Sequence, residues 1–220
     1  MMRGETVVIL AGGTWTRVEW LRSVVSAAGH VIAADGGYSN AVEHGIHVDE
    51  VVGDLDSLRE RDRGRLAADP VTTHFHERNK DWTDLELAVD LALAREPAEI
   101  VVFGASGTRL DHTLTGVHLL EKGLARGVPI KLVAGRETVR LTDDDLVLDV
   151  DVGDRVSLVP LSEACVVSTQ GLRFGLADER LARAASRGVS NAAVEGEVRV
   201  AVREGRLLVF HTPREGGADG

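Results

Sequence analysis

Two short acidic segments carry the side chains of this sequence that are best suited to chemistry. They are Gly53-Asp54-Leu55-Asp56-Ser57 and Lys80-Asp81-Trp82-Thr83-Asp84, and each adjoins an apolar run. Carboxylates that gather at the edge of a sheet repel each other unless a cation lies between them. Mg²⁺ prefers oxygen ligands and usually binds substrate phosphates as well. Together the segments favour a magnesium site for a polyphosphate, although an aspartate pair can also simply cap a turn.

Two glycine pairs follow the first two apolar runs. Gly12-Gly13 comes after Val7–Ala11, and Gly36-Gly37 comes after Val31–Ala34 with Asp35 between. Glycine lets a backbone approach a phosphate or an adenine closely, while Asp35 could bond a ribose or help to hold a metal. A tight turn between a strand and a helix explains each pair about as well. Neither pair matches a dinucleotide-binding or Walker motif.

A third segment, Gly104–His112, runs from the apolar stretch Ile100–Phe103 into a helical pattern. The amides at a helix N-terminus suit phosphate, and Arg109 adds a guanidinium for bidentate contact. Asp111 either caps the helix or orients Arg109 and a metal-bound water. His112 is either an ordinary histidine or a phosphate contact.

The second acidic segment also allows structural interpretations. Lys80 could neutralise a polyphosphate or remain solvated, and we expect Trp82 to pack against the fold. Asp81 and Asp84 lie three residues apart at a predicted helix start. Acidic residues are favoured in the first turn of any helix, so one of the two can be a cap.

The elements that must position these residues change in character along the chain. From residue 5 to about 139, short apolar runs alternate with helical patterns, which predicts a doubly wound, mostly parallel, Rossmann-like α/β sheet. Ligands of such sheets bind at the carboxyl ends of the strands. After Arg140, short strands separated by glycine turns predict an antiparallel β-sandwich. We expect an α/β domain over residues 1–141, a β-sandwich domain over 142–213 and a flexible tail over 214–220.

Hydrophobic periodicity predicts the individual elements. In the first part it predicts strands at Val7–Ala11, Val31–Ala34, Glu50–Val52, Glu99–Phe103 and Ile130–Val133, and helices at Thr16–Ala28, Ser39–His44, Leu85–Arg95 and His112–Arg126. In the second part it predicts strands at Val147–Val150, Arg155–Pro160, Cys165–Thr169, Val198–Val202 and Leu207–His211.

Composition narrows the class of protein. The 220 residues are 44% hydrophobic and 27% charged, which is typical of a globular fold. The net charge of −10, with no basic cluster, makes nucleic acid an unexpected partner. The lone Cys165 excludes an internal disulfide and fits a reducing cytoplasm. The apolar run Val7–Leu10 is too short for a signal peptide or a membrane span, so we expect a cytoplasmic protein without membrane contact.

Six segments resemble the thiamine pyrophosphokinase family, in the same order along nearly the whole chain. They are Ala34–Asn40, Val52–Ser57, Lys80–Glu86, Gly107–His112, Thr169–Phe174 and Gly188–Asn191. The resemblance implies transfer of a pyrophosphoryl group from MgATP to the hydroxyl of thiamine, giving thiamine diphosphate and AMP. It also implies an α/β catalytic domain, a β-sandwich that binds thiamine and forms a homodimer, and thiamine bound where two subunits meet.

The resemblance also implies roles for individual residues. The expected Mg²⁺ ligands are Asp54, Asp56 and Asp84. The expected ATP contacts are Gly12, Gly13, Asp35, Gly36, Gly37, Lys80, Thr83, Arg109 and His112. The expected catalytic residues are Asp81, Asp84, Arg109 and Asp111: Arg109 stabilises the leaving AMP or the transferred group, and one carboxylate polarises the thiamine hydroxyl. Ser190 and Asn191 are expected near the thiamine pyrimidine, with an aromatic platform from Phe174 or Phe210 because the three tryptophans all lie in the first part.

Two other functions fit some of the same residues. A diphosphokinase acting on another alcohol, such as a hydroxymethyl pterin, needs the same MgATP site but not the segments that contain Ser190 and Phe174. A non-catalytic nucleotide sensor needs the glycine pairs but not so many carboxylates in one crevice.

Overall fold

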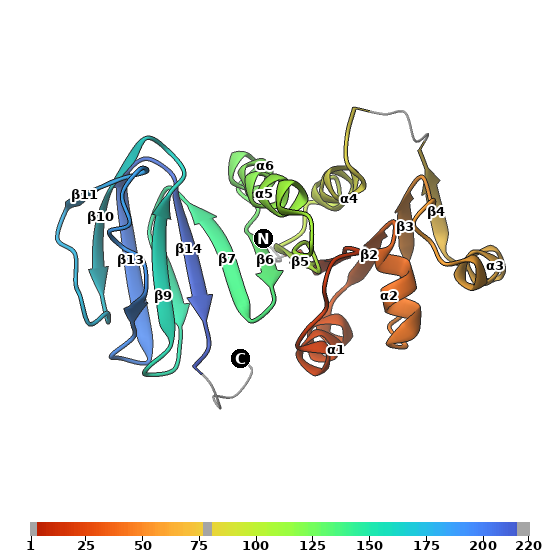
Figure 1. Cartoon of the computed structure of the whole chain (residues 1–220), viewed down its shortest axis with the longest axis horizontal. Helices are drawn as coiled ribbons and strands as arrows, with labels where there is room; N and C mark the ends of the chain where they lie inside the picture. Colours follow the sequence, from red (N-terminus) through yellow and green to blue (C-terminus); the bar gives the residue numbers. More distant parts are fainter. Residues whose placement is uncertain (1–3, 77–80, 215–220) are drawn as a thin grey trace. The chain divides into compact units, whose positions relative to one another are not determined.

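The computed structural model describes residues 4–76 and 81–214, and the chain divides into two compact units after Gly135 (Figure 1). The first unit is α/β and the second is all antiparallel β, which confirms the predicted fold class. The division falls earlier than residue 141 because β7 (Glu137–Thr142) pairs with β14 (Leu207–Thr212) of the second unit.

The first unit is built on a six-stranded parallel sheet in the order β6-β5-β1-β2-β3-β4. Chain order runs outward from β1 in one direction and from β5 in the other, so the switch point lies between these two strands. A doubly wound sheet binds its ligands at such a point. The strands are β1 (Thr6–Leu10), β2 (His30–Ala34), β3 (Glu50–Gly53), β4 (Thr72–Phe75), β5 (Glu99–Phe103) and β6 (Ile130–Ala134).

Helices cover both faces of this sheet. Figure 1 shows α1, α2 and α3 on one side and α4, α5 and α6 on the other. Leu21, Tyr38 and Leu66 of the first three helices pack in one core with Val8, Val51 and other strand residues. The helices are α1 (Val18–Ala27), α2 (Gly37–Glu43), α3 (Glu60–Ala68), α4 (Asp84–Leu93), α5 (Leu110–His118) and α6 (Leu120–Ala125).

Three features of the first unit differ from the predicted elements. The predicted helix at 112–126 is divided into α5 and α6 at Leu119, which ends one helix and begins the other. The helix α3 was not predicted because it is mostly charged and buries only Asp62 and Leu66. The strand β4 was not predicted because it is an edge strand without fully buried side chains.

The second unit contains two antiparallel sheets. One has the order β12-β9-β14-β7 and the other β11-β10-β13-β8. Burial alternates along β9, β10 and β13, and the inward residues share one apolar core. The strands not yet given are β8 (Leu146–Asp149), β9 (Arg155–Pro160), β10 (Ala164–Gln170), β11 (Glu179–Ala182), β12 (Asn191–Ala192) and β13 (Glu197–Glu204). The sequence did not predict β7, β11 and β12.

None of the helices in the described part of the chain has the length and apolar character needed to cross a membrane.

Candidate active site

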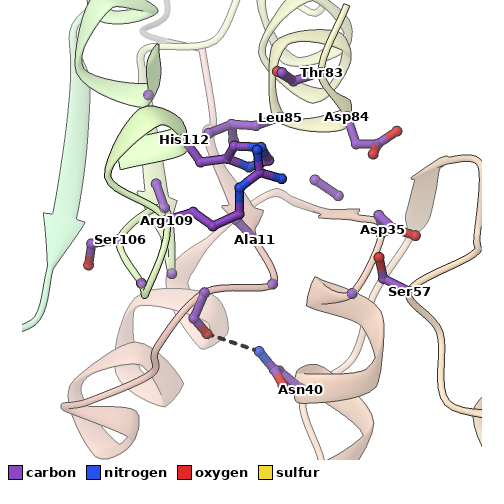
Figure 2. Close-up of a pocket in the computed structure, with 18 of the residues that line it drawn as sticks. Ala11, Asp35, Asn40, Ser57, Thr83, Asp84, Leu85, Ser106, Arg109 and His112 are labelled. Atoms are coloured by element: carbon purple, nitrogen blue, oxygen red, sulfur yellow. Dashed lines mark hydrogen bonds between the residues drawn. The ribbon is translucent and has the colours of Figure 1, made fainter. Parts of the chain in front are cut away.

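A pocket of about 590 Å³ opens in the first unit at the carboxyl ends of β1, β2 and β5 (Figure 2). It therefore lies at the switch point of the sheet, where a doubly wound fold binds ligands. Its walls come from the loops after four strands and from the first turns of α4 and α5. The lining residues that carry polar side chains are Asp35, Ser39, Asn40, Ser57, Arg59, Thr83, Asp84, Ser106, Thr108, Arg109, His112 and Thr115.

Three carboxylates meet beside this pocket. Asp35 directly follows β2, Asp54 directly follows β3, and Asp84 is the first residue of α4. One oxygen from each side chain lies within 4.8 Å of the others, which is close enough for a shared cation. The parallel order of β2 and β3 brings the first two carboxylates to the same edge of the sheet.

Asp35 is the most buried member of this group. Its side-chain oxygen Oδ1 is buried without a hydrogen-bond partner, and its φ of 43° is unusual for a residue other than glycine. Burial raises the pKa of Asp35; a hydrogen bond with Ser57 opposes the rise, and the charges of Asp84 and Asp54 add to it. A buried carboxylate in this state is destabilising, and a bound cation would relieve both the burial and the repulsion.

Gly53 leaves room for the three carboxylates to approach. Its φ is 147°, and a Cβ atom there would lie 2.9 Å from Oδ1 of Asp84 and 3.1 Å from Cβ of Asp35. Any other residue would press on both side chains. The geometry of the three carboxylates therefore explains why a glycine precedes Asp54 in the first acidic segment.

The predicted glycine contacts fall into two groups. Gly12 and Gly36 line the pocket and face each other, because a Cβ on Gly12 would lie 3.3 Å from Cα of Gly36. Gly13 also lines the pocket, but its close packing is against the carbonyl oxygens of Gly104 and Ser106. Gly37 is not among the lining residues; a Cβ there would meet the Leu10 carbonyl, so this glycine lets α2 pack on the end of β1.

Arg109 and His112 line the pocket from the start of α5, and Figure 2 shows their side chains directed into it. The guanidinium of Arg109 donates to Asp111, with an Nη2–Oδ2 distance of 2.6 Å. This hydrogen bond lowers the pKa of Asp111. Asp111 itself is exposed and is not among the lining residues. The bond favours the interpretation in which Asp111 orients Arg109.

The remaining residues of the two acidic segments lie in different surroundings. Thr83 caps α4, accepting a hydrogen bond from the Glu86 amide at 3.2 Å, and it lines the pocket. Asp81 is exposed and does not line the pocket, and Lys80 lies outside the described residues. Asp56 is outside the group of three carboxylates and accepts from the Ser57 hydroxyl at 3.1 Å. Trp82 does not pack as expected, since 55% of it is exposed.

In the second unit, Asn191 begins β12, Ser190 directly precedes it, and Phe174 lies in the loop between β10 and β11. Asn191 is buried and its carboxamide bonds the backbone of Phe174 twice, accepting from N at 3.1 Å and donating to O at 2.7 Å. The Phe174 side chain is nevertheless 68% exposed. Ser190 has a φ of 60°, and its amide donates to Ser157 Oγ at 2.9 Å. Asn191 therefore positions the loop that presents the Phe174 ring.

Several polar side chains of the pocket were not predicted from the sequence. Asn40 lies one helical turn after Gly36, and its Nδ2 donates to the Gly13 carbonyl at 3.3 Å. A helix predicted to begin at Gly37 rather than Ser39 would have placed Asn40 on the pocket side. Arg59 lies just before the unpredicted α3, where the sequence is so rich in charge that it is typical of a solvated surface. The others are Ser39, Ser57, Ser106, Thr108 and Thr115.

Family models match both units. The model described as the catalytic domain of thiamin pyrophosphokinase matches residues 21–132. The model described as the vitamin B1 binding domain of thiamin pyrophosphokinase matches residues 145–207. The two matches follow each other in the order of the two compact units.

Individual proteins show the same similarity. The thiamine pyrophosphokinase of Bacillus subtilis (strain 168) is 27% identical over 211 residues, which are 94% of this chain and 99% of the relative. The crystal structure of the Bacillus subtilis protein has a TM-score of 0.84 at 26% identity, covering 94% of this chain and 99% of that one. The crystal structure of thiamin pyrophosphokinase from Geobacillus thermodenitrificans has a TM-score of 0.82 at 25% identity, covering 96% and 99% of the two chains.

Proposed function

This chain belongs to the thiamin pyrophosphokinase family, and we propose that the pocket of the first unit and its three carboxylates carry out the family's reaction. The protein is a thiamine diphosphokinase that transfers a pyrophosphoryl group from ATP to thiamine. The observation that carries the site assignment is the meeting of Asp35, Asp54 and Asp84 at the edge of a pocket at the switch point. The comparisons support neither the pterin enzyme nor the sensor.

We propose that Asp35, Asp54 and Asp84 hold Mg²⁺. The donor set suits a hard cation, the buried Oδ1 of Asp35 lacks a partner, and Gly53 keeps the space between the side chains open. When bound, the ion would draw negative charge from the phosphates. Asp56, which the sequence analysis expected as a ligand, has no place in this set, and Asp35 replaces it in our proposal.

The side chains and amides of the pocket bind and orient the nucleotide in this proposal. Gly12, Gly13 and Gly36 allow the backbone to approach it, and the first turn of α5, a helix N-terminus that suits phosphate, adjoins the pocket. Arg109 stabilises charge on the leaving AMP or on the transferred group, with Asp111 holding its guanidinium in place. Most of the rate enhancement then comes from positioning and electrostatic stabilisation. Further phosphate contacts are proposed for Lys80, Thr83 and His112.

The thiamine hydroxyl needs a carboxylate nearby to polarise it. Asp81, Asp84 and Asp111 were the candidates from sequence. Asp111 is engaged by Arg109, and Asp81 does not line the pocket. Asp84 lines the pocket and is the candidate that we favour for this role.

We propose that the second unit contributes Ser190, Asn191 and the exposed ring of Phe174 to thiamine binding, and that the protein is a homodimer whose active sites use residues of both subunits. Short strands with open edges gain from a twofold interface, which covers them. Mixing an Asp54→Asn protein with a Ser190→Tyr protein should then restore part of the activity. A monomer by light scattering that still turns over would contradict this proposal.

We also propose a cytoplasmic location and no nucleic-acid partner. The only cysteine, Cys165, is free and buried, and burial raises the pKa of its thiol. A lone buried thiol of this kind needs no oxidising compartment. The net charge of −10 opposes binding to a phosphate backbone.

The direct test of the function is the identity of the products. Incubation with ATP, Mg²⁺ and thiamine should give AMP and thiamine diphosphate in equal amounts. Formation of ADP and thiamine monophosphate would contradict pyrophosphoryl transfer. Faster turnover with a hydroxymethyl pterin than with thiamine would contradict the acceptor.

A further inference from the structure

Arg59 is a lining residue of the pocket to which neither the sequence motifs nor the family resemblance gives a role. It follows the first acidic segment and stands at the N-cap position of α3. Its backbone amide donates to the hydroxyl of Ser39, another lining residue, at 3.2 Å. The start of its side chain is therefore fixed relative to α2.

Both arginines that line the pocket are held in the same way. Arg59 Nη1 lies 2.5 Å from an oxygen of Glu43, at the end of α2. Arg109 Nη2 lies 2.6 Å from an oxygen of Asp111, in the first turn of α5. Neither Glu43 nor Asp111 is among the lining residues, so each carboxylate binds its arginine without itself lining the pocket.

The negative charges around the pocket favour a second positively charged side chain besides Arg109. Asp35 and Asp84 line it and Asp54 lies beside them, whereas ATP brings a polyphosphate of the same sign. Among the described lining residues, the permanently charged cations are Arg59 and Arg109. We propose that Arg59 is a binding residue for the phosphate chain of the nucleotide, acting together with Arg109. This inference rests on the proposed function, because it assumes that the pocket takes a nucleoside triphosphate.

The ion pair with Glu43 does not prevent this role. The Arg59 and Glu43 side chains are 43% and 49% exposed, and ion pairs at such exposure contribute little to stability. A phosphate carries more charge than a carboxylate and fits the planar guanidinium in the same bidentate manner. The pair is therefore weak enough for the guanidinium to exchange Glu43 for a phosphate.

The experiment compares Arg59→Ala with Arg61→Ala, using calorimetry with Mg²⁺ and α,β-methylene ATP, which cannot undergo transfer. Arg61 is the matched control, since it lies two positions further along the same charged segment, is 69% exposed and does not line the pocket. We expect Arg59→Ala to weaken binding of the analogue about 10- to 100-fold and to leave adenosine binding unchanged. Arg61→Ala should change neither, and Arg59→Lys should give an intermediate loss.

Steady-state kinetics give an independent readout. Arg59→Ala should raise KM for ATP more than it lowers kcat, with KM for thiamine unchanged. Glu43→Gln removes the ion pair but keeps the guanidinium, and it should change analogue affinity by less than about threefold. An equal loss for the analogue and adenosine, or a loss in Glu43→Gln as large as in Arg59→Ala, would overturn the inference. Thermal unfolding of each variant checks that the fold is intact.

The proposed function can fail separately. If the wild-type protein neither binds the analogue nor releases AMP, the function is wrong, whatever Arg59 does. If the wild-type protein does both and Arg59→Ala matches Arg61→Ala, only the inference about Arg59 is wrong.

Discussion

In the parallel sheet of the first unit, one carboxylate is buried at the amino ends of the strands and another at the carboxyl ends. The side chains that surround these two carboxylates differ in charge. Glu50 begins β3 and Asp35 follows β2, and they are 7% and 9% exposed. Glu50 lies 2.6 Å from His30 Nε2, 2.5 Å from His74 Nε2 and 2.9 Å from Arg95 Nη1. Asp35 instead faces Asp54 and Asp84 and keeps one oxygen without a partner.

The pKa values of the two groups move in opposite directions for this reason. Burial would raise the pKa of Glu50, but hydrogen bonds from His74 and His30 and the charge of Arg95 outweigh it, so the pKa is lowered. Burial raises the pKa of Asp35, and its acidic neighbours raise it further. Burial alone therefore does not identify a functional carboxylate. The set of partners does: Glu50 is neutralised by the fold, and Asp35 needs a ligand.

The largest expected effect is a loss of activity when a carboxylate at the carboxyl ends of the strands is replaced. Asp54→Asn should lower kcat/KM about 1,000-fold, because one of three proposed metal ligands loses its charge. Its unfolding free energy in the absence of metal should not fall, since the change removes a repulsive charge. Coupled detection of AMP release and urea unfolding measure the two quantities. Activity near that of the wild type would remove Asp54 from the metal site.

Glu50→Gln should show the converse behaviour. Removing the charge leaves His30, His74 and Arg95 around a neutral amide, and breaking a buried charged network costs about 3 kcal/mol of unfolding free energy. Activity per folded molecule should remain within about threefold of the wild type, a change of at most about 0.7 kcal/mol. Urea unfolding and active-site titration provide the test. If Glu50→Gln kept its stability and lost its activity, Glu50 would instead belong to the catalytic site.

The aspartate group and the Glu50 network also show what the sequence can and cannot predict. The strands β1, β2, β3 and β5 were predicted because buried parallel strands are continuous apolar runs. Asp54 and Asp84 were expected as ligands because their acidic segments resemble those of the thiamine pyrophosphokinase family. Asp56 lies outside the group of three carboxylates and follows Leu55, whose φ of 60° is not signalled by any sequence pattern.

The Glu50 network could not be predicted at all. His30, Glu50, His74 and Arg95 are far apart in sequence, and only the neighbouring positions of β2, β3 and β4 bring the first three together. Each of these residues alone is an ordinary polar residue. The same holds for β4 and α3, which cover their neighbours with few apolar side chains of their own.

Metal binding should depend on the aspartates at the carboxyl ends of the strands and not on Glu50. Mg²⁺ or Mn²⁺ at about ten times its Kd should stabilise the wild-type protein by about 1.4 kcal/mol, because the ion binds the folded state and not the unfolded chain. Thermal unfolding with and without metal should show this shift in the wild type and in Glu50→Gln, and not in Asp54→Asn or Asp84→Asn. A shift that persists in both aspartate variants would place the cation elsewhere.

The smallest effect is the pH dependence of stability that Glu50 contributes. Its pKa in the folded protein lies below the ordinary value of 4.5, so the folded state binds its proton more weakly than the unfolded chain. The stabilisation is therefore fully present above about pH 4.5 and is lost as the pH falls through the folded pKa. The difference in unfolding free energy between the wild type and Glu50→Gln should narrow in that acidic window and stay constant above it.

Urea unfolding between about pH 7 and about pH 3 measures this difference. Glu19→Gln is a suitable control, since the Glu19 side chain is 91% exposed and its substitution should leave the profile unchanged. If the difference in unfolding free energy between the wild type and Glu50→Gln remains constant to the lowest pH, the shape of the Glu50 side chain, and not its charge, stabilises the amino end of β3. The contrast with Asp35 would then rest on packing, because a neutral Glu50 would fill its site as well as an ionised one.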